Sequence, residues 1–129
     1  MCSCNSLNGV PTCANLNLTA TLRTRWGFQG YVTTDTDSIT DMYGLHKWTD
    51  EDGAVVAGLT AQTDVESSGS SGTHYNDLIP KLVAAGKITK DMVDRAVRHT
   101  MSVRFKLGLF DPIEGQHYLN ISVKVNPAL

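Results

Sequence analysis

Short apolar runs alternate with amphipathic stretches along the chain. Residues 30–34 are aromatic and β-branched after a glycine, which predicts a strand buried on both faces, as in a parallel sheet. Residues 1–4 and 63–65 predict two further short strands. The spacing of apolar residues and the capping residues predict helices over residues 16–26, 38–43, about 50–61, 75–85 and 90–107.

Strands and helices alternate in this prediction. With the short helix over 38–43 counted together with the helix after it, the order is strand, helix, strand, helix, strand, helix, helix. This order is typical of an α/β fold with parallel strands. Three strands are too few to close an eight-stranded barrel, which takes roughly 250 residues. We therefore expect either a small open sheet or a part of a larger fold.

Two sets of apolar side chains are expected to pack in the core. The last predicted helix carries an apolar stripe of Met92, Val93, Ala96, Val97, Met101 and Phe105. Trp26 and Phe28 precede the strand over 30–34, on the side of such folds that serves stability. We therefore expect these two rings to anchor the core rather than to form a binding surface.

Composition and charge narrow the classes of function. The 129 residues are 41% hydrophobic and 19% charged, an ordinary balance for about one globular domain. The formal net charge of -2 argues against a nucleic-acid partner, because no basic stripe is present to neutralise phosphates. No membrane association is expected either, since no run approaches the ~20 apolar residues of a membrane span. The N-terminus lacks the basic and apolar regions of a signal peptide.

The three cysteines, Cys2, Cys4 and Cys13, lie near one end of the chain. They predict buried or half-buried thiols rather than a disulfide framework. No metal site is expected, because no second ligand pair follows at zinc-like spacing and the four histidines are scattered. Glycosylation sequons at Asn17 and Asn120 permit a secreted or extracellular protein without establishing one, so the compartment stays open.

The candidate chemistry lies at Asp35, which directly follows the strand over 30–34. Enzymes with α/β folds place working groups at the C-terminal ends of their parallel strands. Asp37 and Asp41 extend the acidic cluster. An aspartate after a strand is also a common helix cap, and the residue pattern alone favours a cap over a nucleophile.

Three motifs resemble glycoside hydrolase family 3, and they come in that family's order. Residues 1–13 resemble its signature M-C-S-Y-N-x-x-N-G-x-P-x-C, residues 26–35 its W-G-F-x-G-Y-V-x-S-D, and residues 104–111 its R-x-x-L-G-L-F-D. The resemblance implies that residues 1–108 form about the last three strand–helix units of a (β/α)8 TIM-like barrel. Residues 109–129 would then begin a linker toward a second domain.

The resemblance also implies an activity. It predicts an O-glycosyl hydrolase of the β-glucosidase/β-xylosidase type that acts on a carbohydrate substrate by a retaining double displacement and needs no cofactor. Asp35 falls on the family's nucleophile. Cys4, Asn5 and Thr36 fall on positions expected to lie near the substrate. The acid/base would come from the second domain, so the 129-residue chain alone is expected to be inactive.

The remaining carboxylates and His46 are expected to have ordinary roles. We expect Asp37 and Asp41 to point away from Asp35 and to cap the next helix, because like charges nearby would oppose an ionised nucleophile. His46 is expected to be a surface or loop residue. Three further acidic residues are expected to be solvated surface charges or caps: Glu51, Glu66 and Glu114.

The chain departs from the family pattern at several positions. Cys4 replaces a tyrosine, and Thr36 stands where relatives carry Trp or Cys. Residues 65–69 lack the second cysteine of the xylosidase-like branch, and Gln62 replaces a glycine. The alternatives are therefore a catalytically inactive fragment, a pseudoenzyme or a carbohydrate-binding remnant, and, if the motif matches are coincidence, an unrelated α/β scaffold. The acidic run after residue 34 favours a β-xyloside over a β-glucoside, but the sequence does not decide between them.

Overall fold

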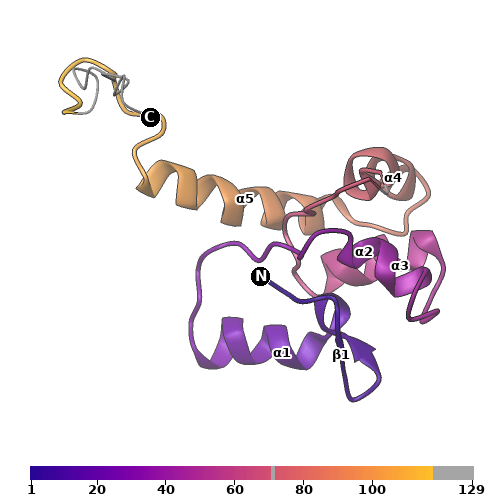
Figure 1. Cartoon of the computed structure of the whole chain (residues 1–129). Helices are drawn as coiled ribbons and strands as arrows, with labels where there is room; N and C mark the ends of the chain where they lie inside the picture. The colour runs from indigo at the N-terminus through magenta and orange to yellow at the C-terminus, as the bar shows by residue number, and fades with distance from the viewer. Residues whose placement is uncertain (71, 118–129) are drawn as a thin grey trace, which may run out of the picture.

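The computed structural model describes residues 1–70 and 72–117. Figure 1 shows a body of short helices from which the last helix projects. The elements are β1 (Ser6–Leu7), β2 (Val10–Pro11), the 3-10 turn η1 (Thr12–Ala14), α1 (Leu16–Ala20), the π-helical turn η2 (Thr21–Arg25), α2 (Ser38–Tyr43), α3 (Glu51–Thr60), α4 (His74–Ala84) and α5 (Lys90–Lys106). Most of the predicted linker over 109–129, and the sequon at Asn120, lie outside the described residues.

Three extended segments lie side by side where the three parallel strands were predicted. They are joined by single parallel bridges, Cys2 to Thr34 and Thr33 to Val65, so the segment around Thr34 is the central one. The predicted parallel direction is thus confirmed, but regular strands over 1–4, 30–34 and 63–65 are wrong. Each outer segment has a neighbour on one side only within the described part of the chain, so little pairing is available to extend it.

The predicted helix ends are largely confirmed. The Asp50 carboxylate accepts a hydrogen bond from the Gly53 amide at 2.7 Å at the start of α3, and the Thr89 hydroxyl accepts one from the Met92 amide at 3.3 Å at the start of α5. Gly86 has a positive φ after α4, as a left-handed cap requires. The first predicted helix differs, because after α1 it continues as the wider turn η2.

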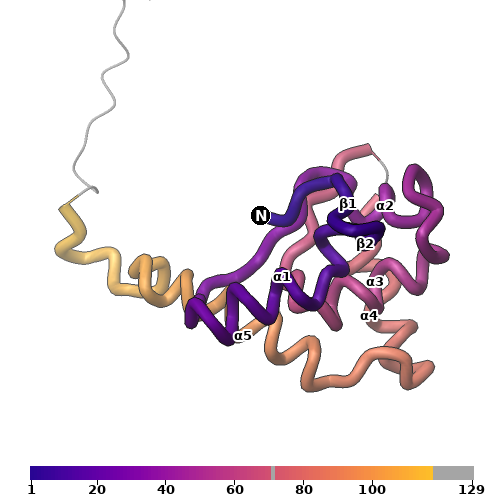
Figure 2. Tube along the Cα trace, turned by 90° about the horizontal axis from the view of Figure 1, so that it is seen from below, coloured from indigo at the N-terminus to yellow at the C-terminus, as the bar shows by residue number. Residues whose placement is uncertain are grey.

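The core lies where α3 packs against α2, α4 and the start of α5 (Figure 2). Ile39 and Met42 of α2 are fully buried, as are Ala54 and Val55 of α3. These side chains exclude water from the face of the helices that lies behind the extended segments. The extended segments are therefore supported by a packed layer of helices.

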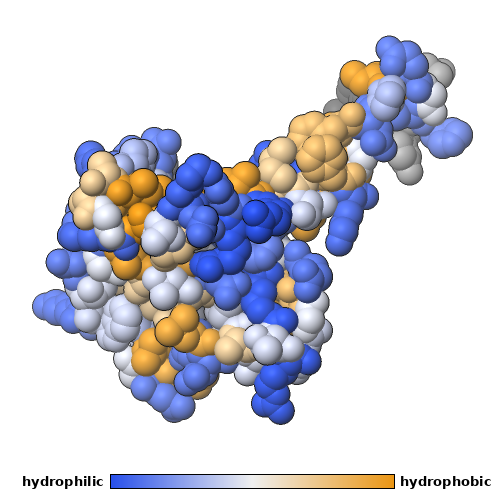
Figure 3. All heavy atoms as spheres, turned by 180° about the vertical axis from the view of Figure 1, so that it is seen from behind, coloured by the Kyte–Doolittle hydropathy of each residue, from blue (hydrophilic) through white to orange (hydrophobic). Residues whose placement is uncertain are grey.

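The stripe on α5 enters this core only at its N-terminal end. Ala96 is 7% exposed, whereas Val97 and Phe105 are 54% and 61% exposed. Figure 3 shows hydrophobic side chains along the projecting arm that α5 and the following segment form. The expected core role of the whole stripe is therefore wrong, because Val97 and Phe105 stay largely exposed even though the Phe105 ring packs against that of Phe110. The same holds for Trp26 and Phe28, which are 75% and 40% exposed.

A buried carboxylate joins the central extended segment to two helical elements. Asp64, whose side chain is fully buried, accepts a hydrogen bond from the Arg23 guanidinium at 2.6 Å, from the Val32 amide at 2.9 Å and from His99 Nδ1 at 2.9 Å. Arg23 lies in η2 and His99 in α5. The Arg23 guanidinium also lies 5.3 Å from the centre of the Phe28 ring. The Asp64 side chain thus connects elements from the first and last thirds of the chain.

Two of the three cysteines form a disulfide, which overturns the prediction of thiols only. Cys2 and Cys13 are bonded with their Cα atoms 5.1 Å apart, and Cys4 is free. Cys2 and Cys4, two residues apart on one face of an extended segment, are poorly placed to bond each other. The β1–β2 hairpin, which pairs Leu7 with Val10, folds the chain back and brings Cys13 beside Cys2 instead.

Removal of the Asp64 carboxylate tests its role in the fold. Asp64→Ala should lower the free energy of unfolding by about 3–5 kcal/mol, because it leaves the buried Arg23 guanidinium without its counter-charge. Asp94→Ala removes an exposed ion pair with Lys90 and should cost less than about 1 kcal/mol. Urea unfolding followed by circular dichroism measures both, and similar losses in the two variants would contradict the assignment.

The disulfide makes a separate prediction. In urea without reductant one thiol, that of Cys4, should react with a thiol-specific reagent, and three should react after reduction. Replacing Cys2 and Cys13 together by alanine should lower the unfolding free energy by about 3 kcal/mol through the freer unfolded chain. Three reactive thiols in the chain purified under oxidising conditions would contradict the pairing.

Candidate functional site

The residues that follow the three extended segments meet at one edge, here called the rim. It comprises Cys4 and Asn5 after the first segment, Asp35 and Thr36 after the second, and Ser67 after the third. The backbone holds them in place: the Asp35 amide donates to the Cys2 carbonyl at 2.8 Å, and the Thr34 amide to the Val65 carbonyl at 2.9 Å. The rim thus brings Asp35, Cys4 and Thr36 together at the C-terminal ends of the parallel segments.

Asp35 is half-buried at the centre of the rim. One carboxylate oxygen accepts a hydrogen bond from the Thr36 amide at 2.8 Å, and the Asp35 carbonyl accepts one from the Ser38 amide at 3.2 Å. Asp35 therefore does not cap α2 through its side chain, which was the alternative that the residue pattern favoured. The bond from Thr36 orients a short carboxylate whose backbone is fixed on both sides.

The hydroxyls of Thr36 and Ser67 meet across the rim, with their Oγ atoms 3.3 Å apart. The Ser67 backbone reinforces this junction, since its amide donates to the Thr34 hydroxyl at 2.8 Å and its carbonyl accepts from the Asp37 amide at 3.0 Å. The second and third segments are thus joined here by hydrogen bonds.

The expected capping roles of Asp37 and Asp41 are wrong. Asp37 does occupy the position before α2, but its backbone is left-handed, with φ 62°, and its side chain makes no capping bond. Its carboxylate instead accepts the Gly69 amide at 2.8 Å. Asp41 lies within α2 and acts on the Cys4 thiol. The left-handed backbone turns the Asp37 side chain away from α2 and toward the Gly69 amide, which follows the third segment.

Cys4 faces this acidic side of the rim. Its sulfur lies 3.1 Å from the Ser38 hydroxyl and 3.7 Å from the Thr36 carbonyl. The Ser38 hydrogen bond lowers the pKa of the thiol, but burial and the carboxylates of Asp41 and Asp35 outweigh it, so the pKa of Cys4 is raised above its ordinary value. The thiol is therefore protonated at neutral pH, a weak donor beside Asp35 rather than a nucleophile.

Asn5 and His46 form the outer wall of the rim. Asn5 is exposed, and its carbonyl accepts a hydrogen bond from the Thr12 amide at 3.0 Å. His46 Nε2 lies 2.6 Å from the Cys4 carbonyl, and Nδ1 lies 3.3 Å from the Ser6 hydroxyl. His46 lies in the loop between α2 and α3, as expected of a surface or loop residue, and it also holds the Cys4 segment in place. No spacing signal links positions 46 and 4, so only the fold reveals this contact.

Glu66 was expected to be a solvated charge, and this expectation is wrong. Its side chain is 5% exposed and lies 2.7 Å from His74 Nδ1. Burial explains the difference, because Glu66 follows the third segment directly and faces the start of α4. The segment over residues 63–65 is too short to show an alternation of buried and exposed positions, so the sequence alone does not predict that Glu66 is buried.

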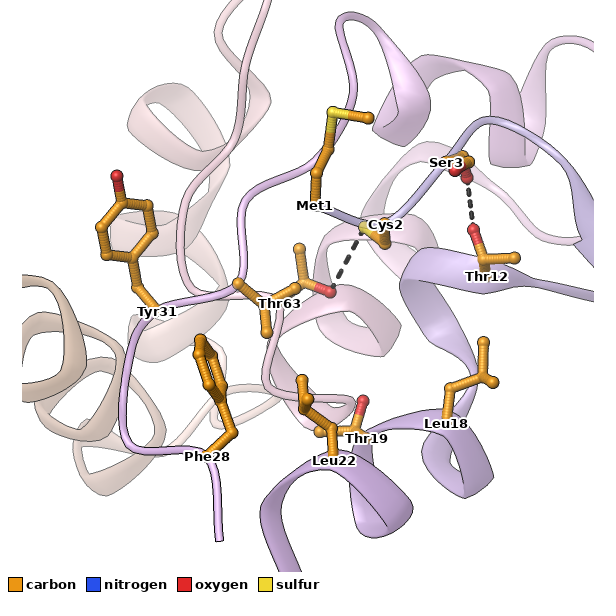
Figure 4. Close-up of a pocket in the computed structure, with 11 residues that line it drawn as sticks. Met1, Cys2, Ser3, Thr12, Leu18, Thr19, Leu22, Phe28, Tyr31 and Thr63 are labelled. Atoms are coloured by element: carbon orange, nitrogen blue, oxygen red, sulfur yellow. Dashed lines mark hydrogen bonds between the residues drawn. The ribbon is translucent and has the colours of Figure 1, made fainter. Parts of the chain in front are cut away.

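An apolar cavity lies at the opposite end of the extended segments. It has a volume of about 310 Å³ and is lined by residues of α1, η2 and the first two segments, among them Cys2, Leu18, Leu22, Phe28 and Tyr31. Figure 4 shows these side chains around it. Asp35 does not line this cavity, so the hollow and the rim are separate features.

Neither a membrane-spanning helix nor a cluster of metal ligands is present in the described residues. No helix in residues 1–70 or 72–117 combines the length and apolar character needed to cross a membrane. The same residues contain no group of three or more His, Cys, Asp or Glu side chains placed to hold a metal ion.

Comparisons with known proteins agree with one another. Residues 1–103 match the family model described as the glycosyl hydrolase family 3 N terminal domain. A probable β-D-xylosidase 6 of Arabidopsis thaliana is 35% identical over 120 residues, which are 91% of this chain and 15% of that protein. The chain therefore spans about one seventh of that relative's length.

Solved structures give the same result. A β-glucosidase from Erythrobacter marinus superposes with a TM-score of 0.77 at 34% identity, over 84% of this chain and 14% of that one. A family 3 exo-β-xylosidase in complex with a xylobiose aziridine activity-based probe superposes with a TM-score of 0.77 at 26% identity, over 92% of this chain and 15% of that one. The short extended segments thus match a part of much larger proteins.

The charge at the rim can be tested through Cys4. Because its pKa is raised, alkylation of Cys4 by iodoacetamide at pH 8 should be slower in the folded chain than in urea. Asp41→Asn removes a carboxylate that raises this pKa, so it should speed alkylation of the folded chain, whereas Asp94→Asn on α5 should not. Mass spectrometry measures the rates. Equal rates in the Asp41→Asn and parent chains would place Asp41 away from the thiol.

Proposed function

This chain belongs to glycosyl hydrolase family 3, and we propose that it contributes the last three strand–helix units of a barrel whose nucleophile is Asp35. The family's N-terminal domain has a TIM-barrel-like α/β fold. The observation that carries the proposal is the position of Asp35: a half-buried carboxylate on the central of three parallel segments, at their C-terminal ends. Barrel enzymes build their active sites at this end.

The open sides of the molecule support the proposal of a partial barrel. The apolar cavity opens between the extended segments and α1, and Val97 and Phe105 of α5 are 54% and 61% exposed. In a closed barrel further strand–helix units would cover such apolar surfaces. The segments would then gain neighbours on both sides, which would extend their single bridges into strands.

The proposed reaction is hydrolysis of a terminal non-reducing β-D-glycosyl residue with retention. In such reactions two carboxyl groups about 5–5.5 Å apart flank the glycosidic bond. Asp35 attacks the anomeric carbon and forms a glycosyl–enzyme ester as the leaving group departs, and water later hydrolyses this ester. The hydrogen bond from the Thr36 amide orients the Asp35 carboxylate for this attack.

The second carboxyl group is proposed to come from a domain that follows residue 109. It protonates the leaving oxygen in the first step and activates water in the second. The relatives include proteins named as β-xylosidases and β-glucosidases, so the substrate class is a β-xyloside or β-glucoside. Cys4, Asn5 and Thr36 are proposed to lie beside the bound sugar.

The second candidate is an inactive member or carbohydrate-binding remnant of the family. Cys4 favours it, because a weak thiol donor stands where the family motif has a tyrosine. Asp35 argues against it, since the motif aspartate is kept and its backbone is held from both neighbouring segments.

A grafting experiment tests the proposal. Residues 1–108 would replace the matching segment of a full-length β-D-xylosidase of the family, and turnover of an aryl β-xyloside and an aryl β-glucoside would be measured. The graft should be active, and Asp35→Asn should lower kcat on the order of 10³-fold or more, about 4 kcal/mol of activation free energy. The neutral amide keeps the shape but cannot form the ester.

The controls separate chemistry from folding. Asp94→Asn changes an exposed carboxylate on α5 and should leave kcat within about twofold. The 129-residue chain alone should show no turnover, because it lacks the acid/base. An inactive graft that folds, or an active Asp35→Asn graft, would refute the proposed nucleophile.

A further inference from the structure

A buried hydrogen-bond network lies directly behind the rim. The Glu66 carboxylate uses both oxygens: one lies 2.7 Å from His74 Nδ1, and the other accepts the Tyr75 amide at 2.6 Å. The side chains of Glu66 and His74 are 5% and 4% exposed. Glu66 thus fixes the end of the third segment to the first turn of α4.

His74 extends the network to the helix that follows Asp35. A carboxylate can only accept, so His74 Nδ1 donates to Glu66, and in the neutral ring Nε2 accepts from the Tyr43 hydroxyl at 2.9 Å. The Tyr43 and His74 rings also meet edge to face, 5.7 Å apart. Tyr43 is the last residue of α2, so the histidine ties this helix to Glu66.

The network reaches Asp35 through Ser67, the residue after Glu66. The Ser67 carbonyl accepts the Asp37 amide at 3.0 Å, and the Ser67 amide donates to the Thr34 hydroxyl at 2.8 Å. These two bonds lie on either side of Asp35 in the sequence. A shift of Glu66 would therefore move both anchors of the loop that carries the carboxylate.

We propose that Glu66 and His74 are positioning residues that hold the Asp35 loop in its reactive place at the rim. The inference rests on the proposed role of Asp35. Neither side chain reaches the rim, and both act through Ser67 and α2. A displacement of a few tenths of an ångström at Asp35 lowers the rate of attack because reaction needs close alignment with the anomeric carbon.

The molecule offers a matched control. His99 also donates from Nδ1 to a buried carboxylate, that of Asp64, at 2.9 Å. Its network joins α5 to η2 and the start of the central segment and has no direct bond to residues 34–37. His74→Phe therefore removes a histidine–carboxylate hydrogen bond at Glu66. His99→Phe removes the same kind of bond at Asp64, on the other side of Val65 in the sequence.

Amide hydrogen exchange of the full chain tests the anchoring without any activity. In His74→Phe and Glu66→Ala the Asp37 amide should exchange about tenfold faster relative to the Leu59 amide in the core of α3, since a local anchor is lost. Glu66→Gln keeps an acceptor for the Tyr75 amide and should show a smaller change. In His99→Phe the ratio should be unchanged. An unchanged ratio in His74→Phe overturns the inference.

Kinetics of the grafted enzyme test the consequence. His74→Phe should lower kcat about tenfold or more with KM within about twofold, and slow labelling of Asp35 by a xylobiose aziridine probe to the same degree. His99→Phe should lower the melting temperature but leave kcat unchanged. Equal kcat in His74→Phe and the parent graft overturns the positioning role. Loss of Asp35 labelling in the parent graft itself would instead refute the proposed function.

Discussion

The fold depends on a carboxylate that has no access to water. Asp64 receives the Arg23 guanidinium, the Val32 amide and His99, and these groups come from a helical turn, the central segment and the last helix. A buried charge is costly unless it is fully paired, so the three elements can assemble only in the arrangement that satisfies it. In a chain whose parallel segments share single bridges, this side chain supplies the order that a longer ladder would provide.

Two carboxylates at alternate positions, Asp64 and Glu66, bind different helices. Asp64 and Glu66 are separated by Val65, whose backbone carbonyl pairs with the Thr34 amide. Asp64 binds His99 of α5 and Glu66 binds His74 of α4, so the third segment and the residue after it fix two helices through two buried carboxylate–histidine pairs. The first pair stabilises the fold, and the second lies behind the rim. Asp35 is held by the backbone bond from its amide to Cys2 and by the bond from the Thr36 amide to its carboxylate.

The order of the elements and the place of Asp35 could be predicted from the sequence, because both depend on residues that are neighbours in the chain. The caps at Asp50 and Thr89 and the run that ends at Asp35 need no knowledge of the rest of the chain. Contacts between distant residues were not predictable in this way. The Cys2–Cys13 bond depends on a hairpin, and the links of His46 to Cys4 and of Glu66 to His74 depend on how helices return to the segments. The exposed half of the α5 stripe was also missed, because an apolar pattern predicts a partner but not whether the partner belongs to the same 129 residues.

The most direct test of Asp35 as the nucleophile is a crystal structure of the grafted enzyme after reaction with a xyloside or glucoside whose glycosyl–enzyme ester hydrolyses slowly. Electron density should run without a break from a carboxylate oxygen of Asp35 to the anomeric carbon of the sugar. Density joining the sugar to another carboxylate, with Asp35 turned away from it, would show that Asp35 is not the nucleophile.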